Sequence, residues 1–231
     1  MLSDRINVLI DDAIYLEHAW DPPRDYLGAS IAGHACDRCV QYHHLVSIKQ
    51  IPEVMPEPRT RRIFERGHFL EACAKKWLAD AGFVFYPTPA EVSDFDGKFK
   101  GHVDGVIFDF KGGNCPIPLP CLWEHKGLGA KGWKAIIKDG LKNYSSTYWG
   151  QIHSYMQHLE LPNCLYTITN GDSLELHHDL YSFDPTEADA VRAKVSRVLT
   201  ATDMGELLPR ISQDPAFYLC AWCQFRKECW K

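Results

Sequence analysis

Alternating helical and strand-like stretches constrain this fold more than any other feature of the sequence. Residues 61–81 carry apolar side chains at helical spacing, and Gly82 directly after them is a natural stop. FVFYPTPAEVSDF, GHVDGVIFDF and CLWEHKG then read as successive strands, the first two joined through DGKFKG. Helical patterns return at 133–142 and at about 144–159.

The second half continues the alternation. NCLYTITNGDSLELHHDLYSF predicts two strands around an Asn-Gly turn at 170–171, and the next segment predicts a helix capped by Thr186. A further helix is expected at 4–19, broken by the two prolines of DPPRDYLGAS. This order predicts an α/β fold whose central mixed sheet is flanked by helices. With 231 residues we expect a single domain, 1–231, with its core at about 60–200.

Composition excludes few partners. The chain is 45% hydrophobic and 24% charged, as globular proteins are, and no apolar run approaches the ~20 residues of a membrane span. The first residues lack a basic stretch followed by a purely apolar one, so we expect no secretory signal, no membrane partner and a cytoplasmic location.

The net charge says little about the binding partners of the chain, but the local distribution of basic residues is informative. A net charge of −5 does not indicate nucleic-acid binding, but residues 126–142 hold five lysines and PRTRRIFER holds four arginines. Either stretch is a solvated surface or a contact for phosphates. The candidates for backbone contacts are Arg61, Arg62, Lys131 and Lys134.

Three residues in the strand-like stretches carry a specific chemistry. Asp104 heads one strand-like run, and Glu124 and Lys126 lie on the next. Carboxylates on adjacent strands can hold a hard divalent ion, and a lysine two residues after the second carboxylate faces the same side. Such a set fits metal-assisted cleavage of phosphodiester bonds, in which Lys126 assists the attacking water. The side chain of His125 would face the opposite side, leaving its backbone carbonyl as a further ligand. Alternatively, Glu124 and Lys126 form a plain ion pair and Asp104 belongs to a turn.

Four motifs in order extend this hypothesis. RGHFLEACAKKWL places Glu71 four residues after Gly67, with His68 between them; GHVDG, WEHKG and QIHSYMQHL follow. Over about residues 60–160 the chain therefore resembles the PD-(D/E)XK nuclease superfamily, in its RecB-like and phage-exonuclease branch. The resemblance implies a restriction-endonuclease-like core and a magnesium or manganese ion. The implied metal ligands are Glu71, His68, Asp104, Glu124 and His125. Gln151 and Tyr155 would position the scissile phosphate.

The nine cysteines are odd in number, which argues against a disulfide framework. The spacing of Cys220, Cys223 and Cys229, with Cys36 far upstream, resembles the iron–sulfur members of the superfamily, such as the RecB-like nucleases of CRISPR adaptation and the AddB-type helicase–nucleases. The resemblance implies a structural [4Fe–4S] cluster on these four thiolates, joining residues 28–45 to 215–231. Cys39 departs from the pattern, so a zinc site on Cys36, Cys39, Cys220 and Cys223 is an alternative.

The function implied is that of a metal-dependent DNA exonuclease acting on linear ends or single strands. The glutamate four residues after Gly67 favours recombination, repair or phage DNA processing over CRISPR adaptation, so a phage-encoded protein would act in the host cytoplasm. A helicase or recombinase would be a natural partner. Two alternatives stay open: a non-catalytic DNA-binding or adaptor module on a nuclease fold, and a zinc-stapled endonuclease.

Overall fold

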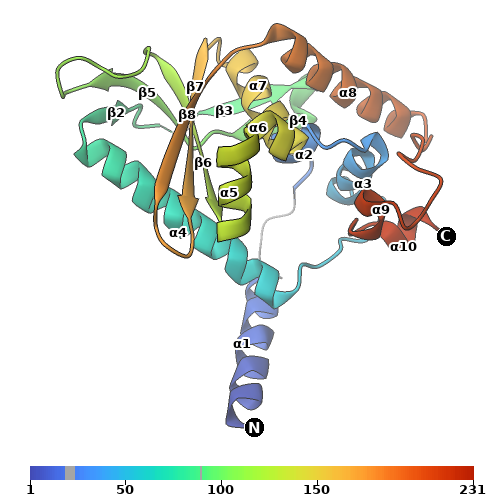
Figure 1. Cartoon of the computed structure of the whole chain (residues 1–231). Helices are drawn as coiled ribbons and strands as arrows, with labels where there is room; N and C mark the ends of the chain where they lie inside the picture. Colours follow the sequence, from blue (N-terminus) through green and yellow to red (C-terminus); the bar gives the residue numbers. More distant parts are fainter. Residues whose placement is uncertain (19–23, 89) are drawn as a thin grey trace.

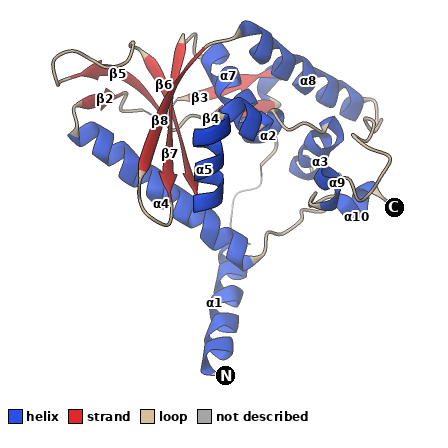
Figure 2. Ribbon diagram, in the orientation of Figure 1, coloured by secondary structure: helices blue, strands red, loops and turns tan. Residues whose placement is uncertain are grey.

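The strands of the protein form two sheets in the computed structural model, which describes residues 1–18, 24–88 and 90–231 (Figure 2). The larger sheet has the order β2-β5-β6-β7-β8, with β6 and β7 parallel and the other neighbours antiparallel. Its strands are β2 (Phe83–Phe85), β5 (Gly105–Phe110), β6 (Cys121–Leu128), β7 (Asn163–Asn170) and β8 (Leu176–Ser182). The smaller sheet, β1-β4-β3, consists of β1 (Leu27–Gly28), β4 (Phe99–His102) and β3 (Glu91–Asp94). The predicted α/β fold with a mixed central sheet is thus confirmed.

Helices cover both faces of the larger sheet, as Figure 1 shows. On one face α4 (Pro58–Asp80) packs over β6, and Ala74 contacts a small core around Trp123 and Leu165. On the other face α7 (Ser146–His158) and α8 (Pro185–Asp203) close a larger core with the smaller sheet. The remaining helices are α1 (Leu2–His18), α2 (Ala29–Ala32), α3 (Asp37–Ser47), α5 (Ala130–Asp139), α6 (Leu141–Tyr144), α9 (Tyr218–Ala221) and α10 (Arg226–Cys229), with a 3₁₀ turn at Phe95–Gly97. None of the described helices has the length and apolar character needed to cross a bilayer.

Two of the predicted strands are each divided between the sheets. GHVDGVIFDF forms β4 in the smaller sheet and β5 in the larger one, and Asp104 lies at the junction. FVFYPTPAEVSDF likewise splits into β2 and β3, with Pro89 outside the described residues. Both segments are rich in apolar, aromatic and β-branched residues, so composition alone predicts one strand in each.

Several helix boundaries in the structure differ by a few residues from those predicted from the sequence. The cap of α8 is Asp184, not Thr186: the Asp184 carboxylate accepts the Thr186 N–H at 2.9 Å, because Pro185 already occupies the first helical position. The expected 133–142 helix begins at Ala130 and ends before Gly140, whose φ of 75° stops it. Residue 19 of the predicted N-terminal helix, and the two prolines expected to break it, lie outside the described residues.

The segments that carry the terminal cysteines pack together. Helices α3, α9 and α10 lie side by side near the C-terminus (Figure 1). Cys39, Tyr42, Leu45 and Phe225 form a separate apolar cluster between them, with the Tyr42 and Phe225 ring centroids 5.4 Å apart. Val40 of α3 also belongs to the sheet core, so α3 is anchored there, whereas α9 and α10 pack on α3 through this small separate cluster.

Helix α2 crosses α7 at a point that only glycine permits. A Cβ on Gly150 would lie 2.7 Å from the Cα of Gly33 and 3.0 Å from Cγ2 of Val191. We expect Gly150→Ala to lower the free energy of unfolding by about 1–3 kcal/mol, because the two backbones must separate. Urea unfolding measures this change. Gly129→Ala is the matched control, since its Cβ would enter open space; equal effects of both substitutions would contradict the close crossing.

Candidate active site

Asp104 and Glu124 face each other across two antiparallel strands. The pairing of Gly105 with Trp123 places Asp104 opposite Glu124. The backbone N–H of His125 donates to Oδ2 of Asp104 at 2.8 Å, which fixes this carboxylate against β6. The junction between the two sheets therefore places the Asp104 carboxylate beside β6, the strand that carries Glu124.

Glu124 and Lys126 form a buried ion pair on the α7 side of β6. The Lys126 Nζ lies 2.5 Å from Oε1 of Glu124, whose side chain is only 1% exposed. Burial and the nearby Asp104 raise the pKa of Glu124 to about 8. Burial alone would lower the pKa of Lys126, but the Glu124 and Asp104 carboxylates outweigh it and raise that pKa. Oε2 of Glu124 is buried and has no hydrogen-bond partner among the described residues.

Helix α4 brings a third carboxylate to the same place. Burial and the neighbouring Asp104 raise the pKa of Glu71. Burial also raises the pKa of Asp104, against the opposing effect of Lys126. His68 lies one turn before Glu71, with its Nδ1 3.9 Å from Glu71 Oε2, but its side chain is 81% exposed. His68 therefore stands at the rim of the site, Glu71 and Asp104 are half-buried, and Glu124 is fully buried.

Lys75 belongs to this site and was missed in the sequence. Its Nζ donates to the backbone carbonyl of Asp104 at 2.6 Å and lies 5.2 Å from the ring centroid of Phe85. The sequence contained the information needed to predict it, because Lys75 follows Glu71 by four residues and this spacing places both on one side of a helix. Lys75 therefore connects α4 to the backbone of Asp104, directly before β5.

Gln151 and Tyr155 lie one turn apart on α7, as the motif implied. The Gln151 side-chain amide donates to the Tyr155 hydroxyl at 3.2 Å, and both residues are buried. Burial, with a contribution from Glu124, raises the pKa of Tyr155, so its hydroxyl keeps its proton. A Cβ on Gly101 would lie 2.6 Å from the Tyr155 ring, so β4 packs directly against this pair.

His125 points away from the carboxylates. Its Nε2 lies 2.8 Å from Oγ1 of Thr169, and burial lowers the pKa of the ring to about 4. The ring is therefore neutral and engaged on the α4 side of the sheet, so only the backbone of His125 lies beside Asp104.

The expected DNA contacts are dispersed. Arg62 pairs with Asp11 of α1 at 2.6 Å, with both side chains partly exposed. Lys131 and Lys134 are exposed on α5, which follows directly after β6. Arg61 lies beside Arg62 in the first half of α4. The structure thus places Lys131 and Lys134 near the end of the strand that carries Glu124 and Lys126.

The donor set fits a hard divalent ion. Among the described residues no three His, Cys, Asp or Glu side chains are arranged to hold a metal. The three carboxylates nevertheless outnumber the two lysines, Lys75 and Lys126; each carboxylate has a raised pKa, and Oε2 of Glu124 is buried without a hydrogen-bond partner among the described residues. Magnesium and manganese prefer such oxygen ligands, and either ion would relieve the excess negative charge that raises these pKa values.

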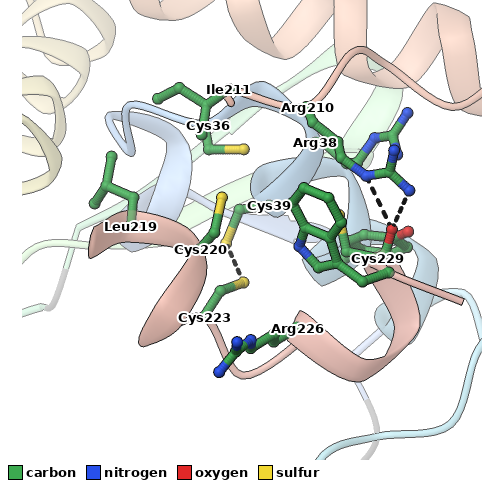
Figure 3. A pocket seen from close by; sticks show the side chains of 12 residues that line it. Cys36, Arg38, Cys39, Arg210, Ile211, Leu219, Cys220, Cys223, Arg226 and Cys229 are labelled. Carbon is green, nitrogen blue, oxygen red and sulfur yellow. Dashed lines mark hydrogen bonds between the residues drawn. The ribbon is translucent and has the colours of Figure 1, made fainter. Parts of the chain in front are cut away.

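The terminal cysteines converge on one cavity, shown in Figure 3. Its lining includes Cys36, Cys39, Cys220, Cys223 and Cys229, none of them in a disulfide. The Cys39 and Cys223 sulfur atoms lie 3.8 Å apart, and this contact lowers the pKa of Cys223 to about 6. Figure 3 shows the sulfur atoms of Cys36, Cys220 and Cys223 directed into the same space. Clustered free thiols are soft ligands that suit an iron–sulfur cluster or zinc.

Comparison with solved structures identifies relatives of this fold. The alkaline exonuclease LHK-Exo from Laribacter hongkongensis has a TM-score of 0.56 at 14% identity, over 79% of this chain and 90% of that chain. Its complex with dAMP gives a TM-score of 0.56 at 15% identity, over 78% and 89%. The structure of SSO0001 gives 0.50 at 16% identity, over 97% and 96%. No protein-family model and no curated protein sequence matched. At these identities the likeness shows that the chain has the fold of the alkaline exonuclease.

A divalent ion should stabilise the protein more at pH 8 than at pH 6. In the metal-free protein the raised pKa of Glu124 makes the folded state bind more protons between pH 4.5 and about 8, so stability falls as pH rises through that window. A metal must displace that proton, so its apparent affinity should be at least about tenfold weaker at pH 6.

Thermal unfolding with and without magnesium or manganese at the two pH values measures the difference. Glu124→Gln should remove the metal-induced shift, whereas Glu91→Gln, a substitution of an exposed glutamate, should retain it. A metal-induced shift that is equal at both pH values would contradict the assignment.

Proposed function

We propose that this protein is a magnesium- or manganese-dependent deoxyribonuclease of the PD-(D/E)XK type that degrades DNA from ends or as single strands. The observation that carries the proposal is the buried Glu124, with one oxygen paired to Lys126 and the other without a partner, directly opposite Asp104. Lys126 balances the charge of Glu124, but Asp104 and Glu71 add further carboxylates nearby, and a bound cation would balance these. The fold shared with an alkaline exonuclease supports the same function.

Each residue has a role in this proposal. Glu71, Asp104 and Glu124 would hold the ion, with the His125 carbonyl and His68 as further candidate ligands. When bound, the ion supplies charge neutralisation at the phosphate and an activated water. The raised pKa of Lys126 keeps its ammonium group protonated, so Lys126 donates hydrogen bonds to the developing negative charge. Tyr155 holds Gln151 towards the phosphate, and Lys131, Lys134, Arg61 and Arg62 contact the DNA backbone.

We further propose that Cys36, Cys220, Cys223 and Cys229 hold a structural [4Fe–4S] cluster. The convergence of free cysteines from α3 and the C-terminal segment on one cavity supports it. Four thiolate bonds would join two segments that the small apolar cluster around Phe225 holds weakly by itself. The proximity of Cys39 to Cys223 favours the second possibility, a zinc ion on Cys36, Cys39, Cys220 and Cys223.

Recombination, repair or phage DNA processing would use such a nuclease, in the cytoplasm and beside a helicase or recombinase. A non-catalytic DNA-binding module would have the same fold without cutting. An endonuclease would cut closed circular DNA, whereas the proposed exonuclease degrades only linear DNA.

Asp104→Asn and Glu124→Gln should each lower the cutting of end-labelled linear DNA by at least about 100-fold, since each removes a charge that holds the ion. Digestion with magnesium or manganese, followed on a sequencing gel, measures the rate. Asp139→Asn changes an exposed aspartate at the end of α5 and should cut like the unmodified protein. Full activity of Asp104→Asn would overturn the assignment, and no cutting with any divalent ion would leave the binding module.

Protein purified without oxygen should contain about four irons per chain and absorb broadly near ~400 nm, as a four-thiolate cluster does. Cys220→Ser should lose most of this iron, because one of four ligands is gone. Cys115→Ser is the matched control, since Cys115 lies in the loop before β6 and not at the cavity. Zinc in place of iron would establish the alternative zinc site. Protein free of both metals would contradict both the iron–sulfur cluster and the zinc site.

A further inference from the structure

Helix α1 leaves most of its apolar side chains uncovered. Figure 1 shows that α1 stands clear of the two sheets, with its N-terminal end directed away from them and its other end beside α4. The large apolar side chains of α1 that are 43–73% exposed are Leu2, Ile6, Val8, Leu9, Ile10, Tyr15 and Leu16. A helix of 17 residues gains little stability from its backbone alone, so α1 needs another surface to pack against.

The apolar residues of α1 include a regular stripe. Alternating steps of four and three residues, the a/d pattern of a coiled coil, connect Leu2, Ile6, Leu9, Ala13 and Leu16. This spacing places the five side chains along one side of the helix, and all five residues are exposed. Such a stripe fits the matching stripe of a second helix, because the side chains of one interdigitate with those of the other.

The charge of α1 restricts the choice of partner. Its one arginine, Arg5, is outnumbered by four acidic residues, which are Asp4, Asp11, Asp12 and Glu17. A helix with this excess of negative charge repels the phosphates of DNA and the anionic headgroups of a membrane surface. The stripe therefore suits a protein helix as its occupant.

Helix α1 is complementary to a second copy of itself when the two helices run antiparallel. One alignment packs Ile6 of each helix against Leu9 of the other, at the centre of the stripe. In the same alignment Arg5 of each helix lies beside Asp12 of the other, on the flank of the stripe. The two-fold symmetry of the pair forms this ion pair twice.

A parallel arrangement lacks this complementarity. It would place Asp12 of one helix beside Glu17 of the other, so that two like charges would meet at the flank of the stripe. The antiparallel arrangement also leaves room for the rest of both molecules. Because the sheets lie beyond the C-terminal end of α1, those of the two copies would lie at opposite ends of the helix pair (Figure 1).

Arg5 and Asp12 are both available for this contact. Both are exposed, and the ion pairs of α1 within the described part of the chain instead use Asp4, with the N-terminal amine, and Asp11, with Arg62. In one helix Arg5 and Asp12 are seven residues apart, which is about 10 Å along the axis, so they do not pair with each other. Their complementarity therefore acts only between two helices.

We propose that two copies of this protein associate through α1 as an antiparallel helix pair, with Ile6 and Leu9 at its centre and an Arg5–Asp12 ion pair on each side. The stripe spans only two heptads, so the dimer is weak and depends on protein concentration. The proposal does not depend on the proposed nuclease function, because α1 carries none of the residues of the candidate active site.

Sedimentation velocity of the full-length protein over a series of concentrations measures the dissociation constant of the dimer. Leu9→Glu should raise this constant by about tenfold or more, since it places a carboxylate in the apolar stripe at two symmetric positions. Arg5→Glu and Asp12→Arg should each raise it by about fivefold, because two ion pairs become two pairs of like charges. Lys138→Glu is the matched control, since it makes an equal change of charge at the exposed end of α5 and should leave the constant unchanged.

A mixture of two variants tests the antiparallel pairing itself. Arg5→Glu and Asp12→Arg should associate with each other as tightly as the unmodified protein does, because the new glutamate then faces the new arginine and the original Arg5 and Asp12 face each other. Restored association in this mixture supports the proposal even if Leu9→Glu disturbs the folding of α1. An unmodified protein that stays monomeric at every concentration overturns the proposal. A dimer that Leu9→Glu leaves unchanged, or a mixture that associates no better than its components, also overturns it.

Discussion

The burial of charge on β6 is the constraint on which the rest of this structure depends. The strand turns Cys121 and Trp123 towards α4 and Glu124 and Lys126 towards α7, so the sheet core and the candidate site share one backbone. A carboxylate with 1% of its side chain exposed is unfavourable unless a partner compensates its charge. Lys126 compensates one carboxylate, while Glu71 and Asp104 add two more negative groups. Three carboxylates beside two lysines, Lys75 and Lys126, therefore leave an excess of negative charge at this position when all of these groups are ionised.

The smaller sheet has its clearest role in holding Asp104. The chain leaves β4 at His102 and enters β5 at Gly105, so Asp104 lies where it passes from one sheet to the other. Val103 is buried on one side of this junction, and Gly101 packs on Tyr155 of α7. Lys75 and the His125 N–H then hold the carbonyl and the carboxylate of Asp104. Gln151 and Tyr155 of α7 and the Asp104 carboxylate are thus fixed by one set of contacts.

Local sequence patterns predicted the elements better than their arrangement. Side-chain alternation was enough to place Glu124 and Lys126 on one side of a strand with His125 on the other, because that is a property of a single strand. The switch between sheets at Asp104 was not predictable this way, since the sheet that a strand joins is decided by tertiary packing. Lys75 could have been predicted as a site residue, because it follows Glu71 by one helical turn. A lysine on an amphipathic helix is, however, ordinarily solvated. The pocket between α4 and β2 could not be predicted from the sequence, because Lys76, Tyr86 and Lys111 come together only through tertiary packing.

The charges of the chain are unevenly distributed along α4. In the first half of the helix Arg62 is already paired with Asp11 of α1, a helix that also carries Asp4, Asp12 and Glu17. In the second half Lys75 and Lys76 line a groove without acidic side chains. The net charge of −5 therefore includes the acidic residues of α1 and the carboxylates beside β6, and the lysines of α4 give this part of the surface a different local charge.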